Sequence, residues 1–148
     1  MNIEYKRIDY IILSKMIEDY GEWVKQYIYI RDDTFPFAAM DGDKPVGFVC
    51  VTPRGLDYPL EHLQDAFIEV LEVHEDYRRR GIGQHLIACS EEWAKKAGFM
   101  QIRTHSNNQA VQAINMWLKL KYGLCSHDYN DDDPKKNDGR GYWVAKVL

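Results

Sequence analysis

The spacing of apolar residues along the chain predicts strands and helices that alternate from one end to the other. Apolar residues recur every three or four positions over residues 10–30, which is helical spacing, and Gly21 is expected to divide this stretch into two short helices. Further amphipathic helices are expected over residues 82–97 and after the N-capping side chains of Ser106, Asn107 and Asn108. Strands are expected at residues 3–8, 35–40, 46–52, 66–73, 101–105, 124–129 and 142–148.

These elements predict an α/β (α+β) fold with a mixed, mostly antiparallel sheet of six to seven strands and helices on both faces. Residues 46–51 are apolar at both parities, as expected of a central strand that is covered on both sides. Residues 53–64 are expected to form a loop, with Gly55 and Pro59 as breaks. Because no repeat, linker or change of composition divides the chain, residues 1–148 are expected to form one domain.

Composition and charge exclude several classes of protein. The 148 residues are 45% hydrophobic and 13% aromatic, which is ample for a core, and the net charge of −4 argues against a general nucleic-acid binder. No signal region or membrane-spanning apolar run is present. Cys50, Cys89 and Cys125 suggest no disulfide framework, so a cytoplasmic location is expected. The five histidines show no metal-ligand spacing, and no bound metal is expected.

The turn after the strand at residues 66–73 carries the clearest chemical signal. Three arginines and two glycines lead directly into an amphipathic helix, as Arg78-Arg79-Arg80-Gly81-Ile82-Gly83-Gln84. Backbone N–H groups at a helix N-terminus are unsatisfied and bind phosphate well. Gly81 and Gly83 lack the Cβ atoms that would hold a phosphate away from those amides, and arginines add charge-assisted contacts. The turn therefore predicts an anionic, phosphorylated ligand, the alternative being a solvated basic turn that caps the helix.

The pattern R-x-x-G-x-G, formed by Arg78, Gly81 and Gly83, resembles the pyrophosphate-binding motif of the GNAT superfamily of acetyl-CoA-dependent N-acetyltransferases. The P-loop spacing is absent, and the third glycine of a dinucleotide fingerprint is missing. The spacing Leu71-x-Val73-x-x-x-Tyr77 is similar to the family's fourth strand and its exit, and residues 106–122 resemble its last helix. The resemblance implies a splayed central pair of strands, acetyl-CoA as cosubstrate, and direct acetyl transfer to an amine of a small molecule or protein in a ternary complex. A homodimer is left open.

The resemblance also implies a set of cofactor-binding residues. Backbone amides of Leu71 and Val73 would bind the pantetheine and polarise the thioester carbonyl. The remaining cofactor-binding residues implied are Arg78, Arg79, Arg80, Gly81, Ile82, Gly83, Gln84 and Asn108.

Two glutamates in the strand at residues 66–73 are candidate catalytic bases. In an unbulged strand Glu69 and Glu72 face opposite sides of the sheet. A glutamate among apolar strand positions is costly to bury unless it is paired, so one of the two is expected in a cleft. Glu69 matches an acceptor-site glutamate of the family's polyamine-type members and is the expected base. A salt bridge or an exposed strand edge remains the alternative for each.

Trp117 is the third candidate catalytic residue. It stands where the family commonly has a tyrosine that protonates the departing thiolate, which an indole cannot do. A core role is therefore favoured, with a contact to the sulfur or pantetheine left open, and a noncatalytic acyl-CoA-binding regulatory domain is the alternative function. Tyr122 lies about 140° round the helix from Trp117 and cannot simply substitute for the tyrosine.

Other polar residues near the expected cleft are weaker candidates. His74 and His105 fall near the expected ends of the splayed strands, where either could relay protons. Asp131, Asp132 and Asp133 lie in the loop before the last strand. By the resemblance this loop lies beside the acceptor side of the cleft, where it would attract a cation.

Overall fold

A computed structural model describes residues 2–107, 109–128 and 140–148 of the chain. Asn108 and the acidic run Asp131, Asp132 and Asp133 lie outside the described residues. No helix in the described ranges is long and apolar enough to cross a bilayer. Cys50, Cys89 and Cys125 are free thiols.

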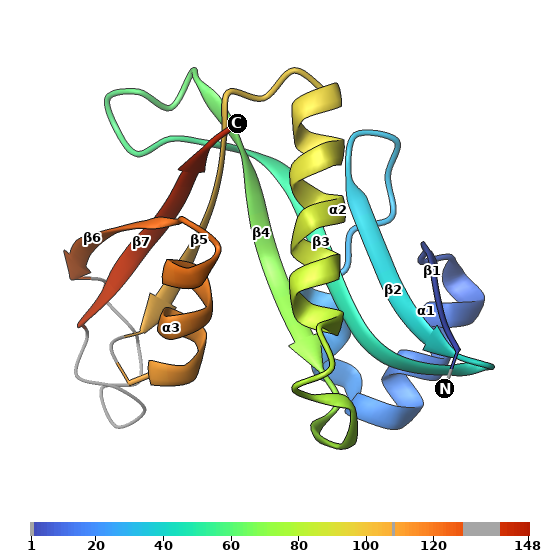
Figure 1. Cartoon of the computed structure of the whole chain (residues 1–148). Coiled ribbons are helices and arrows are strands. Elements are labelled where there is room, and N and C mark those ends of the chain that lie inside the picture. The colour runs from blue at the N-terminus through green and yellow to red at the C-terminus, as the bar shows by residue number, and fades with distance from the viewer. Residues whose placement is uncertain (1, 108, 129–139) are drawn as a thin grey trace.

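Within the described ranges, seven strands form one mixed sheet in the order β1-β2-β3-β4-β5-β7-β6 (Figure 1). All neighbouring strands pair antiparallel except β4 and β5, which are parallel. This arrangement confirms the expected fold class. The strands are β1 (Ile3–Arg7), β2 (Phe35–Asp41), β3 (Lys44–Gly55), β4 (Gln64–Val73), β5 (Gln101–Asn107), β6 (Gly123–Asp128) and β7 (Arg140–Val147).

Helices cover both faces of this sheet (Figure 1). Helix α1 (Tyr10–Tyr20) begins at Asp9, whose side chain accepts a hydrogen bond from the backbone of Ile12, and it ends at Gly21 with φ of 109°. The short 3₁₀ helix η1 (Glu22–Gln26) follows, so Gly21 divides the segment as expected. The other helical elements are η2 (Glu75–Tyr77), α2 (Ile82–Lys96) and α3 (Val111–Lys119).

The two faces carry separate buried clusters. The α1-side cluster joins residues of α1 and η1 to one face of the sheet: Ile8, Ile12, Met16, Val24, Ile28, Ala38, Met40, Phe48 and Cys50. The α2-side cluster joins α2 and α3 to the other face, and includes Val49, Val51, Ile68, Leu86, Ile87, Ile102, Trp117 and Tyr122. Strand β3 contributes to both clusters, as its apolar residues at both parities predicted.

Several element boundaries differ from the sequence-based expectations, among them those of the β3–β4 ladder and of α3. Strands β3 and β4 pair out to Gly55 and Gln64, so their ladder extends into the segment expected to be a loop. The expected N-capping of α3 is also wrong, because Ser106 and Asn107 belong to β5 and the helix begins after Ala110 without a side-chain cap. The Asn107 side chain instead accepts a hydrogen bond from the backbone of Gln109, an Asx-type turn that ends the strand.

Candidate active site

The sheet opens between β4 and β5. The two strands pair only at Ala66 with Ile102 and at Phe67 with Arg103, and after these pairs they diverge (Figure 1). A buried ion pair between Asp65 and Arg103, 2.8 Å long and with each side chain 7% exposed, fastens the closed end of this gap. Beyond Phe67 the edge of β4 has no strand partner in β5, which confirms the expected splay.

A β-bulge in β4 lies at the start of the open part. Across the ladder Val51 faces Ile68 and Cys50 faces Val70, so Glu69 between them has no partner on β3. An extra residue of this kind resets the alternation of side chains along the strand. Ile68 belongs to the α2-side cluster, and Leu71 packs against the same cluster although it lies three positions further on.

The bulge corrects the expectation that the two glutamates face opposite sides of the sheet. Glu69 bonds to Thr52, which lies on the α1 side because its neighbour Val51 points to the α2 side. Glu72 lies opposite Phe48, a residue of the α1-side cluster, and directly opposed residues share a face. Both glutamates therefore emerge on the α1 face.

A first cavity of about 310 Å³ lies between the open edge of β4, the start of α2 and α3. Its walls contain Leu71, Glu72, Val73, Tyr77, Arg78, Arg79, Gly81, Ile82, Gly83, Gln84, Gln112, Ala113 and Met116. Except for Arg80 and the undescribed Asn108, every residue expected to bind the cofactor lines this cavity. The Arg80 guanidinium lies instead 5.4 Å from the centroid of the Tyr77 ring.

The turn before α2 contains two residues in the left-handed region of backbone conformation. Gly81, the N-cap of α2, has φ of 80°, and Arg79 has φ of 63°, a left-handed conformation that is uncommon for residues other than glycine. A Cβ on Gly83 would lie 3.6 Å from Val73 and 3.9 Å from Met116. One methyl group thus fits the fold, whereas a larger side chain at Gly83 would project into the space that a ligand needs.

Glu72 and Arg78 face each other at the mouth of the first cavity. Arg78 donates through Nε to the carbonyl oxygen of Val73 at 3.0 Å, and its Nη2 lies 3.3 Å from Glu72 Oε1. The Glu72 side chain is 34% exposed and that of Arg78 57%, so an ion pair this solvated contributes little to stability. Arg78 can therefore turn to an incoming anion at small cost.

A second cavity, of about 440 Å³, adjoins the first. It is lined by Trp23, Tyr27, Ile68, Glu69, Val70, Leu71, Thr104, His105, Ser106, Ala113, Met116 and Trp117. The two cavities share Leu71, Ala113 and Met116. Ligands bound in the two cavities would meet where the open edge of β4 passes α3. Glu72 is not among the described residues around the second cavity.

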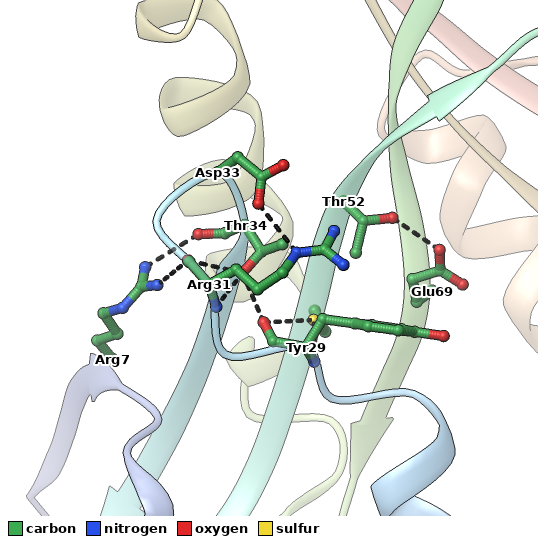
Figure 2. Close-up of polar contacts among 8 residues, drawn as sticks. Arg7, Tyr29, Arg31, Asp33, Thr34, Thr52 and Glu69 are labelled. Carbon is green, nitrogen blue, oxygen red and sulfur yellow. Dashed lines mark hydrogen bonds and ion pairs between the residues drawn. The ribbon is translucent and has the colours of Figure 1, made fainter.

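Two side chains of the neighbouring strand β3 contact the carboxylate of Glu69. The Thr52 hydroxyl donates to Glu69 Oε1 at 2.7 Å (Figure 2), and Arg54 Nη1 lies 3.9 Å from Oε2. The Glu69 side chain is 16% exposed, and its carboxylate is oriented by these two contacts at the wall of the second cavity. A positioned carboxylate beside a cavity can bind an ammonium group or accept its proton.

His105 of β5 is the second ionisable group in the wall of this cavity. Burial lowers its pKa, and electrostatic interactions with the neighbouring His127, Arg54 and Arg103 lower it further. The imidazole is therefore neutral near pH 7 and able to accept a proton. His74, the other histidine considered from sequence, lies elsewhere: its Nδ1 accepts a hydrogen bond from the backbone of Asp76 in η2.

Trp117 belongs both to the core and to the cavity wall. It is 4% exposed, and its ring centroid lies 4.8 Å from that of Tyr122. The Tyr122 hydroxyl donates to Glu91 on α2 at 3.3 Å, and burial together with Glu91 raises the pKa of this phenol. Tyr122 is thus turned toward α2 and is a poor proton donor. The expected angle between Tyr122 and Trp117 is wrong, because α3 ends at Lys119 and Lys121 has φ of 69°, so Tyr122 lies beyond the helix.

Two aromatic residues, Trp23 of η1 and Tyr27 directly after it, were missed as site residues. They fall within the stretch of helical spacing at residues 10–30 and had no expected role in the site, yet each is 39% exposed and lines the second cavity. Their rings pack edge to face with centroids 6.0 Å apart. The one sequence signal against a regular buried helix here is Gly21, which ends the α-helix just before these two residues.

A polar network fixes the loop between η1 and β2 (Figure 2). The buried Thr34 hydroxyl donates to the carbonyl oxygen of Tyr29 at 2.5 Å, and Arg7 donates to the carbonyl oxygens of Thr34 and Arg31. The backbone N–H of Tyr29 lies 3.4 Å from Cys50 Sγ. These contacts fix the backbone of the loop on both sides of Tyr29, at its N–H and at its carbonyl oxygen (Figure 2).

The described residues contain no group of three or more histidine, cysteine, aspartate or glutamate side chains placed to hold a metal ion. The two cavities place a basic, glycine-containing turn at the start of α2 near a carboxylate and an imidazole.

A protein-family model and a curated relative both match this chain, and they indicate the same family. The model of the acetyltransferase (GNAT) family matches residues 4–122. An uncharacterized N-acetyltransferase of Methanocaldococcus jannaschii is 29% identical over 103 residues, which are 70% of this chain and 45% of that protein. The chain thus spans less than half the length of this relative.

Solved structures share the fold at low sequence identity. Arabidopsis thaliana NAA60 in complex with a bisubstrate analogue has a TM-score of 0.76 at 18% identity, covering 99% of this chain and 98% of that chain. Arabidopsis thaliana Naa50 in complex with the bisubstrate analogue CoA-Ac-MVNAL has a TM-score of 0.73 at 16% identity, covering 100% of both chains.

Proposed function

This chain belongs to the acetyltransferase (GNAT) family, and on that premise we propose that it transfers an acetyl group from acetyl-CoA to a primary amine of a small molecule or protein. The observation that carries the proposal is the meeting of the two cavities at Leu71, in the gap between β4 and β5. One cavity has the character of a phosphate site, and the other holds a carboxylate and an imidazole. The bisubstrate analogues in the two plant structures support a reaction in which both substrates are bound together.

The first cavity would take acetyl-CoA. Its pyrophosphate would lie against the backbone amides at the start of α2, with Arg78 and Arg79 adding charge-assisted hydrogen bonds. The pantetheine would run along the open edge of β4, where main-chain groups near Leu71 and Val73 have no partner strand in β5. That path leads from the phosphate side to the second cavity.

The second cavity would take the amine. A lysine-like amine has a reference pKa near 10.4, so it arrives protonated and must lose that proton before it attacks. We assign this general-base role to Glu69, directly or through a water, and His105 is a second acceptor within the same wall. Glu72 pairs with Arg78 in the first cavity, which favours a role in ordering that arginine over a role as base.

The transfer itself forms one bond and breaks another. The amine nitrogen attacks the thioester carbonyl carbon, the C–S bond breaks, and the thiolate of CoA leaves. The backbone N–H of Val73 would stabilise the negative charge on the carbonyl oxygen. A thiol with a reference pKa of about 8.5 is a tolerable leaving group without a strong acid, so the presence of Trp117 is compatible with turnover.

Trp117 also favours the alternative, a noncatalytic acyl-CoA-binding regulatory domain, because a buried tryptophan stands where a proton donor is common. One experiment separates the two functions. Acetyl-CoA is titrated calorimetrically into the protein, and release of free CoA thiol is then followed with a panel of amines. The proposed enzyme binds acetyl-CoA and releases thiol only when an amine is added, whereas a regulatory domain binds acetyl-CoA without release.

A further inference from the structure

Arg54 lies beside Glu69, a residue in the wall of the second cavity, on the same face of β3 as Thr52. Residues two apart on a strand share a face, and both side chains reach Glu69, the Thr52 hydroxyl at 2.7 Å and Arg54 Nη1 at 3.9 Å. Burial is the main cause of the lowered pKa of His105, but electrostatic interactions with His127 and Arg54 add to it. Arg54 therefore stands close to both ionisable groups of the cavity wall.

The Arg54 guanidinium is oriented, yet its hydrogen-bonding capacity is left largely unused by the described residues. Its Cζ lies 4.2 Å from the centroid of the Phe67 ring, a contact that restrains the plane of the group and leaves its N–H edges outward. The side chain is 53% exposed, and 3.9 Å to Glu69 is too long for a hydrogen bond.

Arg103, also near Phe67, shows the opposite arrangement. Its side chain is 7% exposed, its Nε lies 2.8 Å from Asp65, and its Nη2 donates to the carbonyl oxygen of Gly55 at 2.9 Å. Arg103 is thus committed to fastening the closed end of the gap. Arg54 has no comparable structural task among the described contacts and is positioned toward the side where a substrate would sit.

Glu69, in the wall of the second cavity, and Arg54 beside it form a pair of opposite fixed charges, while His105 is neutral near pH 7. Among the other described charges that act on His105, Arg103 is paired with Asp65 and Asp57 adds a negative charge. A substrate with two ammonium groups would bring one of them close to Arg54 and be repelled. A substrate with one ammonium and one anionic group matches the pair, and the exposed rings of Trp23 and Tyr27 offer an apolar wall for the rest of it.

We propose that the acceptor carries a carboxylate or phosphate close to its amine, and that Arg54 binds this anion while Glu69 receives the amine. The inference rests on the proposed acetyl transfer and specifies its substrate class. A planar guanidinium binds carboxylate and phosphate through paired hydrogen bonds, and each such charge-assisted contact is strong. A free amino acid, an amino phosphate and a peptide with an acidic residue beside its terminal amine all share this chemistry.

Matched acceptor pairs test the inference. The pairs are leucine with 3-methylbutylamine, phosphoethanolamine with ethanolamine, and a peptide beginning Met-Glu with one beginning Met-Gln. Wild-type protein is expected to prefer the anionic member of at least one pair by about tenfold or more in kcat/KM. Arg54→Gln should lose most of this preference, and Arg54→Lys should retain part of it. The preference should also shrink as salt is raised.

Lys96→Gln is the matched control, because it removes one positive charge from an exposed side chain at the far end of α2 and should leave the preference unchanged. The pair that shows the preference identifies the source of the anion. Equal efficiency within every pair, or a preference that survives in Arg54→Gln, overturns the inference and leaves acetyl transfer standing. No acetylation of any acceptor by wild-type protein that binds acetyl-CoA overturns the proposed function, and this inference with it.

Discussion

Thr52 and Glu69 are joined by a hydrogen bond of 2.7 Å across the bulge of β4. The bulge leaves Glu69 without a partner in the β3 ladder, and the Thr52 hydroxyl fixes the direction of its carboxylate. A strand irregularity and one side chain from the neighbouring strand thus place a carboxylate at the second cavity, next to the point where it meets the first.

Glu69→Gln should lower turnover by about a hundredfold or more and leave acetyl-CoA affinity nearly intact, because it removes a general base but no part of the first cavity. The residual rate should rise toward high pH, where free amine is abundant. Glu72→Gln is the matched control, with the same change made in the first cavity. If Glu69→Gln is silent in a pH-rate profile and Glu72→Gln is not, the assignment of the base is wrong.

Gly83→Val should weaken acetyl-CoA binding strongly. A Cβ at this position meets Val73 and Met116 only at ordinary contact distance, so the fold tolerates it, while the added methyl groups enter the first cavity. Calorimetry measures the affinity, and Gly123→Val in β6, at a position that lines neither cavity, serves as control. Equal affinity in wild-type and Gly83→Val protein is incompatible with the cofactor assignment.

Trp117→Phe should keep most of the activity and lower the free energy of unfolding by about 1 to 2 kcal/mol, as expected for a smaller ring in a packed core. Trp117→Tyr would place a phenol near the second cavity and could raise turnover. Denaturant unfolding and steady-state rates, measured on the same samples, separate packing from chemistry. Loss of turnover in Trp117→Phe, with folding and acetyl-CoA affinity preserved, would show that the indole N–H takes part.

His105 should make the folded protein sensitive to acid. Burial and neighbouring positive charges lower its pKa in the folded state, so the unfolded chain binds the proton more readily. The contribution of His105 to stability is complete above about pH 6.5 and is lost as the pH falls below that value. Melting temperatures between pH 7.5 and pH 5, chosen to span about one unit either side of the reference pKa, should fall more steeply for wild-type protein than for His105→Asn. Parallel curves would contradict this account, and His74→Asn is the control.

The site was predictable where its signal is local in sequence. The turn from Arg78 to Gln84 combines arginines, glycines and a helix start within a few residues, and all but Arg80 line the first cavity. The open pair β4 and β5 followed from the family resemblance.

The facing of the glutamates was not predictable in the same way, because it depends on one bulged position. Alternation along an ideal strand placed Glu69 and Glu72 on opposite faces, but the register shift opposite Cys50 and Val51 brings both to the α1 face. The place of Trp23 and Tyr27 at the second cavity was not predicted, because an exposed aromatic pair at helical spacing looks the same in sequence as a buried one. Thr52 and Arg54 come from a different strand, and only the folded sheet brings them to Glu69.

Initial-rate kinetics with both substrates varied test the central claim, that adjoining cavities let the amine attack the acetyl group of bound acetyl-CoA directly. Direct transfer in a ternary complex predicts double-reciprocal plots against acetyl-CoA that intersect as the amine concentration is changed, with free CoA released only in the presence of amine. Parallel plots, with CoA released in a first half-reaction before the amine binds, would contradict it.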